Sequence, residues 1–558
     1  MRNQLKGSVK TRNSAIKFLI FALIQLILVW TGSFAQPPAN VVVLQGRITR
    51  DSTLTADKQY LLRGFVTVER GATLTIEPGT IIYGEKETKG SLIIKRGGKI
   101  YANGTKDRPI VFTSAQPVGR RAAGDWGGVI ILGEAPINVP GGTAVIEGGL
   151  GDDGIYGGNN PDDSSGVFRY VRIEFPGVPY QPDNEINGLT LGGVGRKTLI
   201  EYVQVSYSGD DSFEWFGGNV NARYLIAYKG LDDDFDTDFG WSGKVQFALA
   251  VRDPNIADIS GSNGFESDND GTGTTNQPRT SGIFSNVTSI GPMPDTTFAG
   301  YNPNYKRGAH LRRSTRLSLY NSVFLGWPTG IYLDGSNVAN DAQNDTLQIR
   351  NVVLAGIKSA NQVQTNVSGF DAKGWFLRSQ YGNRIYATVS ELKLADPFNS
   401  NPKPIPLSGS PLIGMADFTN PRLQDLTPVN WVGAFGPDST QRWDLGWTNY
   451  DPQNTDYSKF VKVYDRISET PAKFELKQNY PNPFNPETVI EFDLPKSSDV
   501  KLIVYNSLGQ VVEKLVDEYL SSGSYRVKFN GGHLPSGVYF YKLTADGYSS
   551  VKKMLLIK

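Results

Sequence analysis

The sequence predicts an all-β protein, in which a parallel β-helix, a solenoid of stacked coils, is followed by a small antiparallel β-sandwich. Three observations predict this fold. Residues from about 40 to 450 form short runs rich in β-branched and aromatic residues, without long stretches of helical periodicity. Segments of this region recur at offsets of 22 and 26 residues. From about residue 474, a proline-rich segment precedes longer strands in which apolar and polar residues alternate.

Residues 1–35 are predicted to be a signal peptide. Five basic residues precede an apolar run from Phe18 to Trp30, and Ser33-Phe34-Ala35 predicts cleavage before Gln36. The alternative is an N-terminal membrane anchor, but the run is short for a span and contains Gln25. No later stretch has transmembrane length, so no membrane anchor is expected after signal cleavage.

Composition excludes several classes of function. The signal segment carries five of the 56 basic residues and none of the 55 acidic ones, so the remaining chain has a net charge of −4, which argues against nucleic acid as a partner. The 558 residues include no cysteine and only His310 and His533 as histidines. Disulfides, thiol nucleophiles, iron–sulfur clusters, cysteine zinc sites and multi-histidine metal centres are therefore excluded.

Each repeat unit indicates one coil of a solenoid. Residues 69–74 recur as residues 95–100, and residues 308–312 recur as residues 330–334. In such a coil the apolar residues of each short strand fill the interior and the polar ones point outward. From about residue 40 to 415 the chain resembles the right-handed parallel β-helix proteins, and this resemblance implies the handedness.

The end of the solenoid is marked by a change in amino-acid composition. Aromatic and glycine-rich segments at residues 431–436 and 443–447 are expected to cover the last coil, because an open solenoid end is an aggregation edge. The β-helix passenger with this closing segment is assigned to residues 36–450. The polar residues 451–473 are then expected to form a linker.

Residues 474–558 form a separate module. Alternating strands around residues 489–492, 500–505, 524–527 and 537–541 predict a small antiparallel Ig-like β-sandwich. The opening NYPNPFNPET, the middle YNSLGQ, LPSGVYFYKL and the basic-flanked last strand closely resemble the type A C-terminal sorting domain of the type IX secretion system. The resemblance implies Sec-type export and then passage across the outer membrane by the type IX machinery. It thus places the passenger on the outer-membrane surface or outside the cell.

Five segments between residues 200 and 335 align an inward apolar residue with an outward polar one. The outward residues are Glu214, Asp236, Glu266, His310 and Tyr332, at offsets of 22, 30, 44 and 22 residues. We interpret the offset of 44 as two coils and each of the others as one. Because stacked coils lie about 4.8 Å apart, the first three residues are expected to form a ladder of carboxylates.

Like charges at this spacing repel unless a cation, a proton or an arginine lies between them. The hard-oxygen composition favours calcium, and the candidate ligands are Asp234, Asp236, Asp238, Glu266 and Asp268. The alternative is a solvated acidic face with aspartates in ordinary turns.

Three functions remain open from the sequence. The first is binding of glycan or another surface partner, as an adhesion or envelope component, with Glu214, Trp215, Trp241 and Tyr332 as ligand-binding candidates. The second is a polysaccharide lyase or glycoside hydrolase, for which the catalytic candidates are Asp211, Asp236, Glu266, His310 and Arg312. The Asn-Thr-Asp, Gly-His-Gly and Arg-Ile-Lys triplets of polygalacturonases are missing, so binding is preferred over catalysis. The third is a purely structural surface protein.

Overall fold

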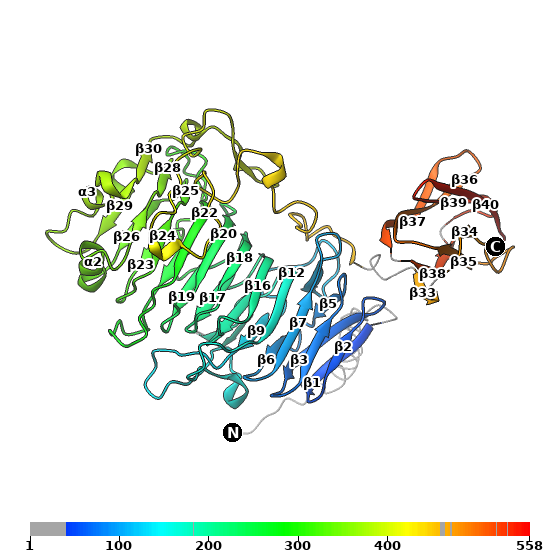
Figure 1. Ribbon diagram of the computed structural model, residues 1–558, viewed down its shortest axis with the longest axis horizontal. Helices are drawn as coiled ribbons and strands as arrows, with labels where there is room; N and C mark the ends of the chain where they lie inside the picture. Colours follow the sequence, from blue (N-terminus) through cyan, green and yellow to red (C-terminus); the bar gives the residue numbers. More distant parts are fainter. Residues whose placement is uncertain (1–40, 182–183, 458–463, 469–470, 521, 533) are drawn as a thin grey trace, which may run out of the picture. The chain divides into compact units, whose positions relative to one another are not determined.

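The computed structural model describes residues 41–457 except 182–183, and residues 464–558 except 469–470, 521 and 533 (Figure 1). The predicted signal peptide lies outside the described residues. Within them a 26-stranded parallel sheet winds through the passenger, and two four-stranded antiparallel sheets form the C-terminal domain. Both parts of the predicted fold class are therefore confirmed.

The described strands of the β-helix fall into three stacks, which we call faces A, B and C. β1 (Val41–Ile48) pairs with β3 (Gln59–Val68) in the first coil. Face A continues from the second half of β3 through β6 (Ser91–Ile94), β9 (Val129–Leu132), β15 (Leu189–Gly192), β17 (Phe213–Phe216), β19 (Phe235–Asp238), β21 (Phe265–Ser267), β23 (Arg307–Leu311), β26 (Thr329–Leu333) and β29 (Val363–Thr365).

Face B contains β2 (Ser52–Leu54), β4 (Thr73–Ile76), β7 (Lys99–Asn103), the first halves of β12 (Gly166–Glu174), β16 (Leu199–Ser206), β18 (Ala222–Tyr228), β20 (Lys244–Val251) and β22 (Ile283–Ile290), then β24 (Ser318–Tyr320) and β27 (Ile349–Arg350). Face C contains the first half of β3, β5 (Ile81–Gly84), β8 (Ile110–Ser114), the second halves of β12, β16, β18, β20 and β22, and then β25 (Val323–Leu325), β28 (Val353–Ala355) and β30 (Arg384–Tyr386). Two short helices, α2 (Ser336–Gln343) and α3 (Ala372–Phe376), follow β26 and β29.

The corner between faces B and C is made by residues with positive φ. Tyr170, Tyr202 and Tyr224 adopt φ values of 49°, 55° and 60° at equivalent positions of successive coils. Their rings stack, with centroids 4.3 Å apart in both pairs. Asparagines, which tolerate this conformation well, occupy the same corner in later coils at Asn286 and Asn321. Ring stacking thus offsets the backbone cost where the residue is aromatic.

The offset of 44 residues proves to be one coil, so the prediction of two coils is wrong. Glu266 of β21 pairs directly with His310 of β23. Long loops around β22 account for the extra length, and loop length is not restricted by the strand register.

The predicted closing segment also lies elsewhere than expected. Residues 412–457, which we call the return segment, run back along the side of the solenoid instead of covering its last coil. Side-chain amides of Gln204 and Gln246 donate to the carbonyls of Asn449 and Thr427, both at 2.7 Å. Trp447 packs edge-on against Tyr170 and Tyr202 of the corner stack. Backbone groups of the return segment therefore form hydrogen bonds with side chains of the coils. At the last coil, the buried side chains are Trp375 and Phe376 of α3.

The predicted linker over residues 451–473 is too long. Tyr457 is buried in the β-helix, where its hydroxyl donates to Glu174 at 2.6 Å. At the other end, β33 (Tyr464–Ser468) pairs with β38 (Gly523–Asn530) and already belongs to the C-terminal domain. A polar composition suggested a linker, but Tyr457 belongs to the β-helix and residues 464–468 belong to the C-terminal domain.

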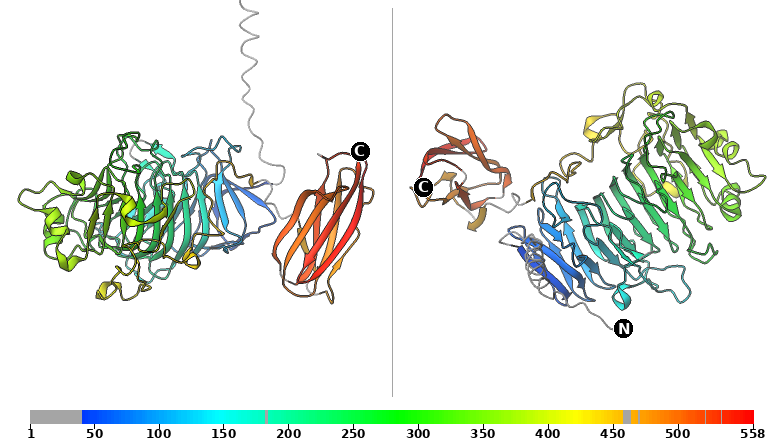
Figure 2. Two further views of the ribbon diagram at one scale, coloured as in Figure 1. Left: turned by 90° about the horizontal axis from the view of Figure 1, so that it is seen from above. Right: turned by 180° about the vertical axis from the view of Figure 1, so that it is seen from behind.

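The C-terminal domain is the predicted antiparallel sandwich (Figure 2, left view). One sheet has the order β33–β38–β35–β34, with β34 (Glu475–Leu476) and β35 (Glu487–Leu494). The other has the order β37–β36–β39–β40, with β36 (Ser498–Asn506), β37 (Val511–Leu520), β39 (Gly537–Ala545) and β40 (Tyr548–Leu556). Its buried residues form a hydrophobic core of their own. Among the described residues, no helix is long and apolar enough to cross a membrane.

Candidate functional site

The candidate site lies on face A, where the register of the strands builds a column of outward side chains. Glu214 pairs with Asp236, Asp236 with Glu266, Glu266 with His310, and His310 with Tyr332. The preceding residues Phe213, Phe235 and Phe265 are buried in the core. The predicted alternation of inward aromatic and outward polar residues is therefore confirmed in these coils.

A second row of polar residues lies two positions before each of these aromatic residues. The row consists of Asn187, Asp211, Asp233 and Asn263, because Asn187 precedes Leu189 in the same way. The backbone N–H of Asp233 donates to Oδ1 of Asp211 at 2.8 Å, and that of Asn263 donates to Asp233. These bonds hold the second row in register from coil to coil.

Carboxylates from the two rows and their neighbours gather into what we call the acidic cluster, formed by Glu147, Asp210, Asp211, Glu214, Asp232, Asp233, Asp236 and Glu266. Oxygen atoms of three triads lie within 4.8 Å of one another: Asp210, Asp211 and Asp232; Asp211, Glu214 and Asp236; Asp233, Asp236 and Glu266. Asp211, Glu214 and Asp233 are buried. The structure thus concentrates more acidic groups here than the predicted ladder of three.

Burial and mutual repulsion raise the pKa values in the acidic cluster. Burial, followed by the charge of Glu147, raises the pKa of Glu214 well above its usual range. Burial and the charge of Glu266 raise the pKa of Asp233 to about 8. Burial and Asp268 likewise raise the pKa of Asp238, beside the cluster, to about 8. A low-dielectric site crowded with carboxylates favours protons or cations over free negative charge.

Basic residues follow the acidic cluster along the same face. Arg312 forms ion pairs with Glu266 and with Asp268, where Nε lies 2.8 Å from Oδ1. Arg313 also pairs with Asp268, at 2.8 Å. Nε2 of His310 lies 2.9 Å from Oδ2 of Asp334, and the imidazole lies beside the ring of Tyr332. His310 and Tyr332 therefore lie on the face that the sequence predicted for them.

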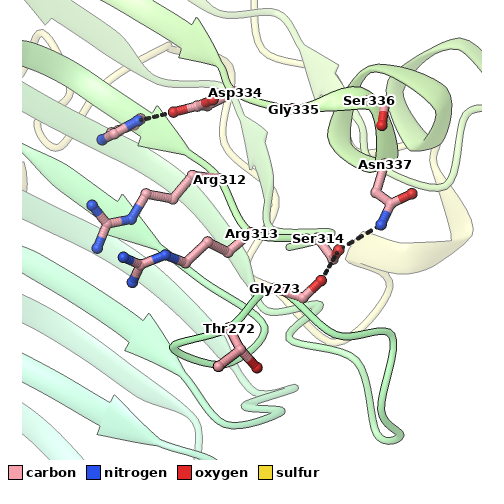
Figure 3. A pocket seen from close by; sticks show the side chains of 10 residues that line it. Thr272, Gly273, Arg312, Arg313, Ser314, Asp334, Gly335, Ser336 and Asn337 are labelled. Carbon is pink, nitrogen blue, oxygen red and sulfur yellow. Dashed lines mark hydrogen bonds and ion pairs between the residues drawn. The ribbon is translucent and has the colours of Figure 1, made fainter.

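Two pockets lie at the end of face A that carries His310 and Tyr332. The first, of 390 Å³, is lined by residues that include His310, Arg312, Arg313 and Asp334 and by the start of α2 (Figure 3). Figure 3 shows Arg312 and Arg313 extending in parallel, with the hydrogen bond of Asp334 above them. The second, of 460 Å³, is lined by Tyr332, Val363, Gln364, Thr365, Phe370, Asp371, Ala372 and Lys373.

The predicted role of Trp215 and Trp241 in ligand binding is wrong. Both side chains are 0% exposed and pack in the core, with ring centroids 5.1 Å apart. Strand alternation explains Trp215, because its neighbour Glu214 points outward. Trp327 and Tyr305 are buried in the same way, so of these aromatic residues Tyr332 is the one that reaches the face.

Asp234 does not join the predicted metal ligands. Its Oδ2 accepts a hydrogen bond from Nε of Arg252 at 3.0 Å, and both side chains are fully buried. Arg252 also donates to the carbonyl of Gly230 at 3.0 Å. Burial raises the pKa of Asp234 to about 7, although the guanidinium of Arg252 opposes this shift. This pair is a structural contact within the coil.

The other predicted metal candidates divide into two groups. Asp236 and Glu266 lie within the acidic cluster, whereas Asp238 and Asp268 lie outside it. Asp268 has two arginine partners, so its charge is already compensated. The catalytic candidate Asp211 lies within the acidic cluster as well.

Sequence reasoning missed Glu147, Asn187 and Asn263. Glu147 comes from the long excursion between β9 and β12, and Nδ2 of Asn187 donates to Oε1 of Glu147 at 3.3 Å and to Glu214. No periodic signal marks Glu147. The two asparagines, in contrast, occupy the position of Asp211 and Asp233, so extending the alignment by two residues would have found them.

Comparisons with known proteins agree with this architecture. Residues 46–389 match the model of the pectate-lyase-like β-helix domain, and residues 478–558 match that of the secretion system C-terminal sorting domain. The chain has no significant match among curated proteins.

Among solved structures, the Dettilon tailspike protein is 11% identical, with 88% of this chain and 87% of that chain covered and a TM-score of 0.23. The enzymatically active domain of tailspike protein 2 from bacteriophage CBA120 is 10% identical, with coverage of 90% and 72% and a TM-score of 0.28. Similarity this low says nothing about what the present chain binds.

The family match spans more than half of the chain and coincides with the coils that carry the acidic cluster. The sorting domain indicates export by the type IX route to the cell surface or the extracellular space. The chain therefore belongs to the pectate-lyase-like β-helix family and carries a type IX secretion sorting domain at its C-terminal end.

Proposed function

We propose that this exported protein binds glycan on face A, as an adhesion or envelope component, with calcium at the acidic cluster. The observation that carries the proposal is the pair of pockets beside the cluster, where donors and acceptors adjoin aromatic rings. Arg313, His310 and Asp334 line the first pocket, and Tyr332 and Phe370 line the second. Sugar hydroxyls require both donors and acceptors, and sugar rings pack well on aromatic side chains.

The donor set of the acidic cluster suits calcium. Carboxylate and amide oxygens are the ligands that this hard cation prefers, and neither thiol nor imidazole is needed. Asp211, Glu214 and Asp236 have carboxylate oxygens within 4.8 Å of one another and would hold an ion, and Asp233, Asp236 and Glu266 form a second such triad. When bound, calcium would supply positive charge that also attracts acidic sugars to the face.

Removing the aromatic and basic groups of the second pocket is expected to weaken glycan retention. The full chain would be passed over immobilised acidic and neutral polysaccharides in the presence of calcium. Tyr332→Ala is expected to reduce retention about fivefold, since an aromatic contact of this kind contributes about 1 kcal/mol. Lys373→Ala removes a positive charge and is expected to weaken the retention of acidic polysaccharides. Lys99→Ala, an exposed change on face B, serves as the matched control. Unchanged retention in both pocket variants would contradict the proposed site.

Cleavage of the bound glycan is a second candidate, favoured by one observation. Glu147 and Glu214 share a hydrogen bond, and burial raises the pKa of Glu147 as well as that of Glu214. A protonated carboxyl beside ionised ones is the arrangement that glycoside hydrolysis needs.

Mass spectrometry of the column effluent distinguishes binding from cleavage. Shortened oligosaccharides that disappear in Glu214→Gln would establish an enzyme. Intact polymer, retained by the unaltered chain, is the result expected from the binding proposal.

A further inference from the structure

One sheet of the C-terminal domain carries apolar side chains on both of its faces. In β36 the inward residues Val500, Leu502 and Val504 are buried in the core of the sandwich. Ile503 and Tyr505 alternate with them and therefore point outward. The register of the sheet β37–β36–β39–β40 gives an outward surface, which we call face D, with these apolar or aromatic residues: Ile503, Tyr505, Val511, Phe540, Val551 and Leu555. Val511 and Val551 are 55% and 54% exposed.

The outward face of the other sheet is polar. Glu491 of β35 lies 2.9 Å from Arg526 of β38, and Glu487 accepts a hydrogen bond from Asn530 at 3.1 Å. An antiparallel sheet with one face in the core commonly has polar residues on its other face, and this sheet follows that rule. Face D departs from it, and contiguous exposed apolar surface of this kind marks a site of interaction.

Lysines accompany the apolar residues of face D. Ile503 lies between Lys514 and Lys542 of the neighbouring strands, and Lys553 projects from β40 on the same face. Asp517 lies 3.4 Å from Lys514 and compensates its charge. Within the described part of the chain, Lys542 and Lys553 form no ion pair. A surface that complements face D is therefore apolar and carries carboxylates opposite these two lysines.

A partner meets the side chains of face D, because the free edge of β40 is already occupied. The backbone N–H of Phe484 donates to the carbonyl of Leu555 at 2.9 Å, and the N–H of Ile557 donates to the carbonyl of Phe484 at 3.0 Å. The N–H of Leu555 donates to Oδ1 of Asn482 at 2.9 Å. The proline-rich opening of the domain thus covers this edge, where another chain would otherwise add a strand.

The segments by which the domain resembles sorting domains supply face D. The segment YNSLGQ contains Tyr505, LPSGVYFYKL contains Phe540 and Lys542, and the basic-flanked last strand contains Lys553 and Leu555. These segments lie apart in the sequence, and strand pairing brings their outward side chains onto one surface. Packing of the core accounts for the inward residues of these strands and leaves the outward ones without a structural role.

From these observations we propose that face D is the surface by which the type IX secretion machinery holds this domain. The component that contacts it presents an apolar surface bordered by carboxylates. This inference concerns the C-terminal domain and does not depend on the function proposed for face A.

Export of the full chain from a bacterium with a type IX system tests the proposal. The double variant Val511→Asp with Val551→Asp is expected to lower the amount at the surface and in the medium about tenfold, because it places carboxylates in an apolar contact that faces acidic groups. Val489→Asp is the matched control, since it changes an outward valine on β35, opposite Lys528. Immunoblots of the cell fractions measure export. Export of the double variant at the level of the control would overturn the proposal.

A second pair of variants keeps the test decisive if the aspartates impair folding. Lys542→Glu with Lys553→Glu is expected to lower export about tenfold, whereas Lys542→Arg with Lys553→Arg keeps the charge and should restore it. Thermal unfolding of the purified full chains is expected to be the same for both pairs. Equal export of the glutamate and arginine pairs would overturn the proposed charge complementarity.

Two other occupants of face D are distinguished by the purified full chain. Sedimentation detects a second copy, and flotation with vesicles of phosphatidylethanolamine and phosphatidylglycerol detects a membrane surface. Dimers or vesicle binding that the Val511→Asp, Val551→Asp variant loses while its export is unchanged would overturn the proposal. Reduced export of a chain that is monomeric and does not float with vesicles is the expected result.

Discussion

Arg252→Ala is expected to lower the free energy of unfolding of the β-helix by about 3–5 kcal/mol, because it leaves the buried carboxylate of Asp234 without its partner. Arg252 also packs beside the rings of Tyr305 and Trp327, so truncation removes packing as well as charge. The change lies directly behind the acidic cluster, whose residue Asp233 precedes Asp234. Urea or thermal unfolding of the full chain, followed by circular dichroism, measures the effect.

Two further variants separate the buried charge from other causes. Replacing both partners with apolar residues, as in Arg252→Met with Asp234→Leu, is expected to cost less than Arg252→Ala alone, since no charge remains buried. Arg313→Ala removes a half-exposed partner of Asp268 and is expected to cost less than about 1 kcal/mol. A cost for Arg252→Ala as small as that for Arg313→Ala would show that the buried pair contributes little.

Deletion of the C-terminal domain is expected to abolish the appearance of the protein at the cell surface and in the medium, because this domain carries the type IX sorting sequence. The truncated chain should accumulate inside the outer membrane as a folded β-helix. Immunoblots of the periplasmic, outer-membrane and extracellular fractions measure the change. Tyr332→Ala is the matched control, since it alters face A and leaves the sorting domain intact. Export of the truncated chain at the level of the control would contradict the assignment.

The position of the truncation matters for this experiment. Ending the chain after residue 463 leaves Tyr457 in place, where it contacts Glu174 and where its carbonyl accepts from Gln59 at 2.8 Å. Ending it at residue 450 removes these contacts. We expect the shorter chain to unfold at a lower temperature. A loss of its export would then reflect both the lower stability of the β-helix and the missing sorting domain.

Local patterns were sufficient to predict the solenoid, the sandwich and the face that carries the site. Strand side chains alternate with a period of two, so Phe213 next to Glu214 already indicates which residue points inward. Coil repeats without long insertions, such as the offset of 22 between His310 and Tyr332, fix which residues share a column. The sorting motifs could be recognised because they follow one another in a fixed order along the chain.

Only the tertiary structure decided which distant segments complete the site and the coils. The excursion that brings Glu147 to Glu214, the single coil that joins Glu266 to His310, and the return segment that pairs with Gln204 all depend on loops of irregular length. Loops follow no period, so their paths are set by the burial and hydrogen bonds they find on the folded coils. Trp241 lies outside the strands, so its place in the core is likewise decided by neighbours far away in the sequence, such as Phe284.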